Sequence, residues 1–171
     1  MADQAVNFTF ELLSRKHGRF SVTAPARFRR EIESYTWRVD RNPERAPGKQ
    51  FAVRTDVGGV TVRLHNLIAS LAGMPASRYR DHVDGDPMNN AEDNIRPATA
   101  SQNAWNRPLQ RTSISGFKGV SWNASVGKWH ARLTANKRCI QLGYFDDPMD
   151  ASNAYVNAAR NLHGEFARVS Q

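Results

Sequence analysis

The chain has 171 residues, 40 % of them hydrophobic and 9 % aromatic, and its formal net charge is +8. That length suits one domain or two small ones, and the hydrophobic content is sufficient for a packed core, which excludes wholesale disorder. A single cysteine, Cys139, excludes an intramolecular disulfide and a CxxC zinc site. The excess of Lys and Arg favours a polyanionic partner, with nucleic acid ahead of an acidic surface.

The N-terminus lacks the pattern of a secretory signal, and no apolar run reaches the roughly 18 residues that a membrane span needs. We therefore expect a cytoplasmic protein, associated with the nucleoid, without a membrane partner. The alternative at this level is a soluble protein that is merely basic.

The first half of the chain predicts short strands and one helix. "NFTFELL" (7–13) and "YTWRVD" (35–40) alternate apolar and polar residues, as half-buried strands do. "NPERAPGK" (42–49) is typical of a loop. "QFAVRTDVGGVTVRLH" (50–65) predicts a hairpin that turns at its Gly-Gly pair, and "LHNLIASLAG" (64–73) predicts a short helix.

The second half predicts a helix, a linker and a small sheet. "TASQNAWNR" (99–107) indicates a helix capped by Thr99 or Ser101, and the polar stretch "RPLQRTSISG" follows it as a linker. Asp146, Asp147 and Pro148 then open a final helix with apolar residues at spacings of three and four. Three strands separated by polar turns precede that helix, "GFKGVSW", "KWHARLTA" and "KRCIQLGYF".

Residues 80 to 103, "RDHVDGDPMNNAEDNIRPATASQN", concentrate acidic and amide side chains around one histidine in an otherwise basic chain. Carboxylate and amide oxygens are the donors that Mg²⁺ prefers, and a nucleic-acid phosphate can complete a site with few protein ligands. Asp81 and His82 are adjacent, so on a strand they point to opposite faces. The tertiary fold must therefore bring both to one centre. Gly85 between Asp84 and Asp86 predicts a turn.

"DHVDGDPMNNAEDNIR" followed by "SQN" resembles the HNH endonuclease family in its phage and intron-homing branch. The resemblance covers residues 50 to 107, and it implies an α+β fold with a ββα-metal (His-Me) finger. It implies that His82 is the general base, that Asn94 fixes the His82 ring, and that Asp81 and Asn103 bind the metal. With only Asp and Asn ligands, Mg²⁺ is expected, with Mn²⁺ as a substitute.

The other residues of this region are expected to have structural roles or either of two alternative roles. Asp84, Asp86 and Asn89 are expected to form the turn, and Asn90 to brace it. Arg96 either clamps a phosphate or is solvated. His65 either contacts DNA or lies in the finger core, and the core is favoured. The basic residues Arg27, Arg29 and Arg30 either extend the grip on DNA or belong to a segment that braces the finger.

"GKWHARL", "LGYFD", "AYVNAAR" and "HGEFA" together resemble the Apetala/ethylene-response-factor DNA-binding domain, a three-stranded antiparallel sheet packed on one helix. Strand alternation puts Trp129, Ala131 and Leu133 on the face covered by the helix. Arg132 is expected to read a guanine, and Lys118, Lys128 and Lys137 to contact phosphates. The positions that the resemblance turns toward DNA are Lys118, Ser121, Asn123, His130, Arg132, Thr134, Cys139 and Gln141.

These predictions combine into a metal-dependent DNA endonuclease whose C-terminal module supplies targeting. The partner is double-stranded DNA, and the protein is a monomer that nicks or a homodimer that cuts both strands. The alternatives are a non-catalytic, sequence-specific DNA-binding regulator, an RNA-binding or RNA-cleaving protein, and a structural phage or chromosomal protein. The expected domains are an extension (1–49), the nuclease domain (50–107), a linker (108–113) and the DNA-binding domain (114–171).

Overall fold

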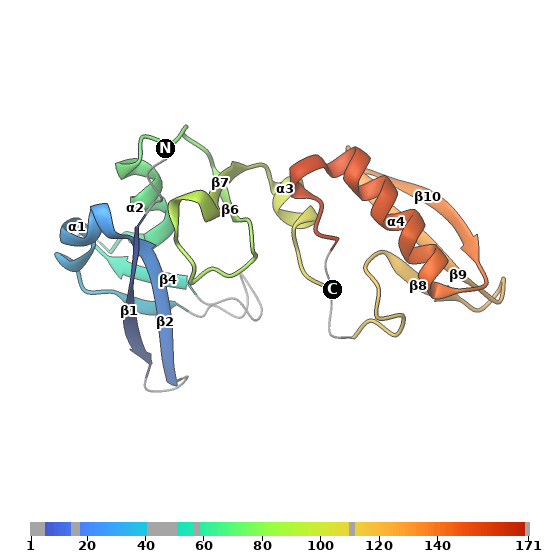
Figure 1. Cartoon of the computed structure of the whole chain (residues 1–171), viewed down its shortest axis with the longest axis horizontal. Coiled ribbons are helices and arrows are strands. Elements are labelled where there is room, and N and C mark those ends of the chain that lie inside the picture. Colours follow the sequence, from blue (N-terminus) through green and yellow to red (C-terminus); the bar gives the residue numbers. More distant parts are fainter. Residues whose placement is uncertain (1–5, 15–17, 41–50, 57–58, 110–111, 170–171) are drawn as a thin grey trace. The chain divides into compact units, whose positions relative to one another are not determined.

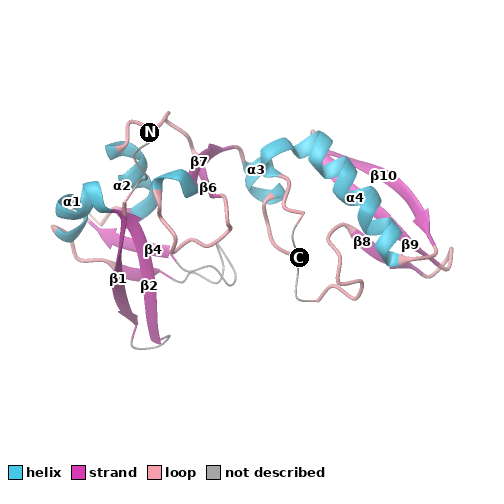
Figure 2. Ribbon diagram, viewed as in Figure 1, coloured by secondary structure: helices cyan, strands magenta, loops and turns pink. Residues whose placement is uncertain are grey.

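The computed structural model describes residues 6–14, 18–40, 51–56, 59–109 and 112–169 (Figure 1). The chain divides into two compact units, Met1–Pro97 and Ala98–Gln171, and each is described by itself. The fold mixes helices with small antiparallel sheets, in line with the predicted α+β class (Figure 2). No helix within the described ranges is long and apolar enough to cross a membrane.

The described part of the N-terminal unit contains three small sheets and two short helices. Its first sheet is an antiparallel hairpin of β1 and β2, its second has the order β3-β4-β5, and its third pairs β6 with β7. The strands are β1 (Asn7–Ser14), β2 (Gly18–Pro25), β3 (Arg38–Asp40), β4 (Phe51–Thr55), β5 (Thr61–Arg63), β6 (Tyr79–His82) and β7 (Ile95–Ala98). The helices are α1 (Arg29–Glu33) and α2 (Leu64–Leu71), with single 3₁₀ turns at η1 (Ala26–Phe28) and η2 (Glu92–Asn94).

One hydrophobic core joins the N-terminal segment to the acidic window. Val22 of β2, Ile68 of α2, and Met88 and Ile95 from the window all belong to it. Residues 6–14 and 18–40 are therefore an integral part of this unit. The predicted strand at 7–13, the hairpin at 50–65 and the helix at 64–73 are confirmed. The strand predicted at 35–40 is confirmed only over Arg38–Asp40, and β2 was not predicted. The predicted loop at 42–49 lies outside the described residues.

The C-terminal unit is the predicted three-stranded antiparallel sheet with one long helix on it. The sheet has the order β10-β9-β8, and Ala131 and Leu133 of the central strand are buried beneath the helix. Asp147 caps that helix by accepting a hydrogen bond from the Met149 amide, as its sequence predicts. The elements are β8 (Val120–Asn123), β9 (Lys128–Ala135), β10 (Arg138–Phe145), α4 (Pro148–His163) and the 3₁₀ turn η3 (Gly164–Phe166).

A short helix, α3 (Ala100–Trp105), also belongs to this unit. Thr99 and Gln102 form a capping box at its start, which confirms the predicted cap. Trp105 stacks on His163 with ring centroids 4.2 Å apart, and Lys118 donates to the Trp105 carbonyl. These contacts tie α3 to the end of α4 and to the segment before β8.

Gly119 is expected to be the least replaceable glycine of the sheet unit. Its φ is +73°, and a Cβ there would lie 2.7 Å from the Arg132 carbonyl oxygen and closer still to the Tyr155 ring. We expect Gly119→Ala to lower the free energy of unfolding by at least about 2 kcal/mol, since strained backbone and overpacking combine.

Gly127→Ala is the matched control, because Gly127 has a similar φ of +67° but no atom within 4 Å of its Cβ position. Backbone strain alone should lower the stability of that variant by about 1 kcal/mol. Urea unfolding measures both variants. Equal losses at the two glycines would contradict the packing argument.

Candidate active site

Asp81 and His82 end strand β6, and both are buried, with 5 % and 6 % of their surfaces exposed. The two side chains have different neighbours, as expected for adjacent strand residues. Asp81 faces Arg96 on the paired strand β7, whereas the His82 ring meets His65 of α2. The structure thus assembles the site from β6, β7, α2 and the loop between residues 83 and 91.

Arg96 forms a buried ion pair with Asp81. Its Nε and Nη2 atoms donate to the same carboxylate oxygen, Oδ2, at 3.0 and 2.8 Å. Only 13 % of the Arg96 side chain and 6 % of the Asp81 side chain are exposed. The solvated alternative is wrong for Arg96, because its guanidinium holds the carboxylate of β6, and a phosphate contact stays a prediction.

His82 lies between a second histidine and an amide. Its ring centroid is 5.1 Å from that of His65 at an interplanar angle of 78°, and its Nε2 is 3.3 Å from Asn90 Oδ1. Burial, followed by the nearby charges of His82, Arg63 and Arg80, holds the pKa of His65 well below 6.5. His65 is therefore neutral at pH 7, and its predicted place in the core is confirmed.

The loop after His82 is held by its own side chains. Asp84 Oδ1 accepts from the Asp86 amide at 2.8 Å and from Asn94 Nδ2 at 2.9 Å, while Asp84 Oδ2 accepts from Asn89 Nδ2 at 2.7 Å. Partial burial acts to raise the pKa of Asp84, but hydrogen bonds from Asn94, Asp86 and Asn89 outweigh it and lower that pKa. The predicted turn-forming role of Asp84, Asp86 and Asn89 is confirmed.

Asn94 acts on this loop and does not hydrogen-bond the His82 ring. Its amide donates to Asp84 and to the Asn89 carbonyl, and its Oδ1 accepts from the Asp84 amide at 3.0 Å. The ring contact expected of Asn94 is made by Asn90, to which the sequence assigned only a bracing role.

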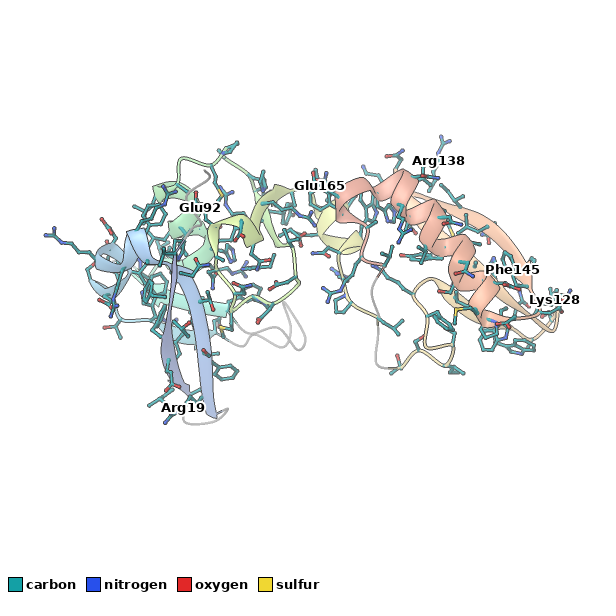
Figure 3. The ribbon with its side chains drawn as sticks, viewed as in Figure 1. Arg19, Glu92, Lys128, Arg138, Phe145 and Glu165 are labelled. Atoms are coloured by element: carbon teal, nitrogen blue, oxygen red, sulfur yellow. The ribbon has the colours of Figure 1, made fainter. Side chains whose placement is uncertain are left out.

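Strand β2, which belongs to the N-terminal hairpin, forms hydrogen bonds with the same loop. The Thr23 amide donates to the Met88 carbonyl at 3.0 Å, and the Asn90 amide donates to the Thr23 carbonyl at 2.8 Å. Arg27 adds two hydrogen bonds to the Glu92 carboxylate, at 2.6 and 2.5 Å, and Figure 3 marks Glu92 in this unit. Arg27 therefore braces the unit, which was one of its two predicted roles.

The donor chemistry at Asp81 suits a hard cation that takes few ligands from the protein. Within the described ranges, no three His, Cys, Asp or Glu side chains form a group that could hold a metal. A carboxylate combined with amide and phosphate oxygens remains compatible with Mg²⁺. Asn103, the other expected ligand, lies on α3 in the C-terminal unit.

The C-terminal sheet has one face turned away from α4. In its register, Ser121 pairs with His130 and Gln141 with Arg132, so these four side chains share that face. His130 is buried beneath Tyr144, with ring centroids 4.6 Å apart. The alternation predicted for β9 is confirmed. We call the set Ser121, Asn123, Lys128, His130, Arg132, Thr134, Cys139 and Gln141 the open sheet face.

The lysines expected to contact phosphates have different surroundings. Lys137 is exposed in the β9–β10 turn with a φ of +62°, and Lys128 pairs with Asp146 at 3.1 Å. Lys128 and Phe145 lie at one end of the sheet, and Arg138 lies at the other (Figure 3). Lys118 is partly buried and its ammonium donates to the Trp105 carbonyl, and its contact with a phosphate stays a prediction. Burial, helped by Arg168, lowers the pKa of Lys118 to about 8.

Comparison with known proteins supports a nuclease. The chain is 28 % identical over 168 residues to an uncharacterized HNH endonuclease of Acanthamoeba polyphaga mimivirus, an alignment that spans 96 % of this chain and 81 % of that protein. It is therefore a distant homologue of a viral HNH endonuclease. It is also 35 % identical over 96 residues to protein 3.8 of Escherichia phage T7, covering 56 % of this chain and 78 % of the T7 protein. The chain belongs to the family of protein 3.8. No family model and no solved structure matches it.

Proposed function

We propose that this protein is a metal-dependent DNA endonuclease of the HNH type. The observation that carries the proposal is the buried Asp81–His82 pair at the end of β6, with the carboxylate held by Arg96 and the imidazole by Asn90. The distant homology to an HNH endonuclease over almost the whole chain supports it. The chain order β6, β7, α3 matches the strand, strand, helix order of a ββα-metal finger.

In this proposal His82 takes the proton from the attacking water, because a neutral imidazole is a suitable general base near pH 7. Asp81 and Asn103 would hold Mg²⁺, or Mn²⁺ in its place, and the bound cation would neutralise charge on the phosphate and on the departing 3′ oxygen. Arg96 keeps the Asp81 carboxylate in one orientation. Asn94 acts indirectly, by locking the loop that follows His82.

The C-terminal unit would supply DNA targeting as an ethylene-response-factor-like domain. Its open sheet face presents Arg132 beside Gln141 on adjacent strands, and such a sheet can lie in the major groove. The net charge of +8 supports a polyanionic partner.

Arg132→Ala is expected to weaken duplex binding by about 1–3 kcal/mol, because a guanine contact is lost. Arg138→Ala is the matched control. Arg138 pairs with the buried Ala135 and so lies on the opposite face of the sheet. Fluorescence anisotropy with labelled genomic duplexes measures both affinities. Equal losses would show that the contribution is general charge and not the open sheet face.

The proposed reaction is tested by incubating the protein with supercoiled plasmid and, in parallel, with structured RNA in Mg²⁺. We expect nicked plasmid whose breaks DNA ligase seals, since hydrolysis of this kind leaves 5′-phosphate and 3′-hydroxyl ends. The RNA should remain intact. Cleaved RNA beside intact plasmid would overturn the proposal in favour of an RNA-cleaving protein.

A further inference from the structure

Asn90 is the most deeply buried polar residue of the window, with 1 % of its surface exposed. Both polar atoms of its side-chain amide, Nδ2 and Oδ1, have hydrogen-bond partners. Nδ2 lies 3.3 Å from the Pro87 carbonyl oxygen and 3.0 Å from that of Met88, and Oδ1 lies 3.3 Å from His82 Nε2.

The orientation of this amide follows from its partners. Both carbonyl oxygens only accept hydrogen bonds, so they must face the NH₂ group of Asn90. A flipped amide would place its own oxygen against two others and lose both bonds. The Met88 carbonyl cannot turn away, because the Thr23 amide also donates to it, and the Asn90 backbone is tied to the Thr23 carbonyl. Oδ1 therefore points at His82.

We propose that Asn90 is a positioning residue that fixes the tautomer of His82, an inference that rests on the proposed function for its consequence. An amide oxygen only accepts, so the hydrogen of the neutral imidazole resides on Nε2. Nδ1 is then the unprotonated nitrogen, and it is the atom that takes the proton from water. The edge-on ring of His65 restricts rotation of the same imidazole.

The chain reaches this arrangement through the N-terminal hairpin. Thr23 of β2 forms backbone hydrogen bonds with Met88 and Asn90, the two neighbours of Asn89. These bonds fix the backbone position from which the Asn90 side-chain amide extends. A strand far upstream of the window thus determines which imidazole nitrogen is basic.

The test is the ¹⁵N–¹H long-range correlation spectrum of the histidine rings in the full-length protein, with the His82 signals identified by their loss in His82→Gln. We expect the pattern of a neutral Nε2–H imidazole. In Asn90→Ala this pattern should move toward a mixture of tautomers. The kcat for plasmid nicking should fall about 10-fold or more with KM unchanged, because the base is then only partly in the reactive form.

Asn89→Ala is the matched control, since Asn89 contacts Asp84 and the Ala91 amide but has no hydrogen bond to His82. It should leave the His82 signals in place. An Nδ1–H pattern in the wild type, or unchanged His82 signals in a folded Asn90→Ala, overturns the inference. The wild-type spectrum decides the matter even if Asn90→Ala does not fold.

The two proposals fail separately. A protein with the Nε2–H pattern that cuts no nucleic acid contradicts the endonuclease and leaves the tautomer assignment standing. A protein that nicks DNA with an Nδ1–H imidazole contradicts the role of Asn90 and leaves the endonuclease standing.

Discussion

His82→Ala is expected to cut DNA about 10²–10⁴-fold more slowly than the wild type and to bind it with the same affinity, because the proposed general base is removed and the open sheet face is untouched. His82 is buried, so folding of the variant must be checked by circular dichroism. Nicking rates and duplex affinity, measured on the same preparation, separate the enzyme from a DNA-binding regulator.

Asp93→Ala is the control for this experiment. Asp93 lies in the same acidic window but is exposed in the η2 turn, and the proposal gives it no part in the reaction. Its nicking rate should match that of the wild type. If His82→Ala cuts as fast as Asp93→Ala, His82 is not the base.

Arg96→Ala is expected to lower the free energy of unfolding by about 3–5 kcal/mol, because it removes the charge and the two hydrogen bonds that Arg96 gives to the buried carboxylate of Asp81. Urea unfolding at pH 7 measures the loss.

Arg27→Ala is the matched control for Arg96. Arg27 also binds one carboxylate through two hydrogen bonds, but 59 % of its side chain and 28 % of that of Glu92 are exposed. Solvent screening should limit its loss to about 0–1 kcal/mol. Similar losses in the two variants would mean that burial does not set the strength of the Asp81–Arg96 pair.

Local patterns in the sequence predicted the C-terminal unit closely. Period-two alternation in "KWHARLTA" placed Ala131 and Leu133 under the helix and Arg132 on the open sheet face, and the structure agrees. The Thr99 cap was predictable for the same reason, since its partner is only three residues away. Interactions within one strand or one turn produce a periodicity or a residue spacing that can be recognised in the sequence.

The contacts that organise the candidate site were not predictable in this way. Arg96 and Asp81 are 15 residues apart, and Thr23 reaches Asn90 from another hairpin. No local propensity records such pairings, because the packing of β2 and β7 brings them about. The expected partner of the His82 ring was therefore Asn94, whereas the structure places Asn90 there. The hydrogen bond from Lys118 to the Trp105 carbonyl was not predictable for the same reason, since tertiary packing brings the two residues together.

Metal-dependent cleavage is measured most directly by conversion of supercoiled plasmid by the wild-type protein before and after removal of divalent metal. We expect open-circular DNA in Mg²⁺, none in EDTA, and recovery when excess Mg²⁺ is restored. Conversion that persists in EDTA would contradict a metal-dependent endonuclease. So would intact plasmid and intact native target DNA in every metal, with protein shown to bind DNA, and that result would leave a DNA-binding regulator.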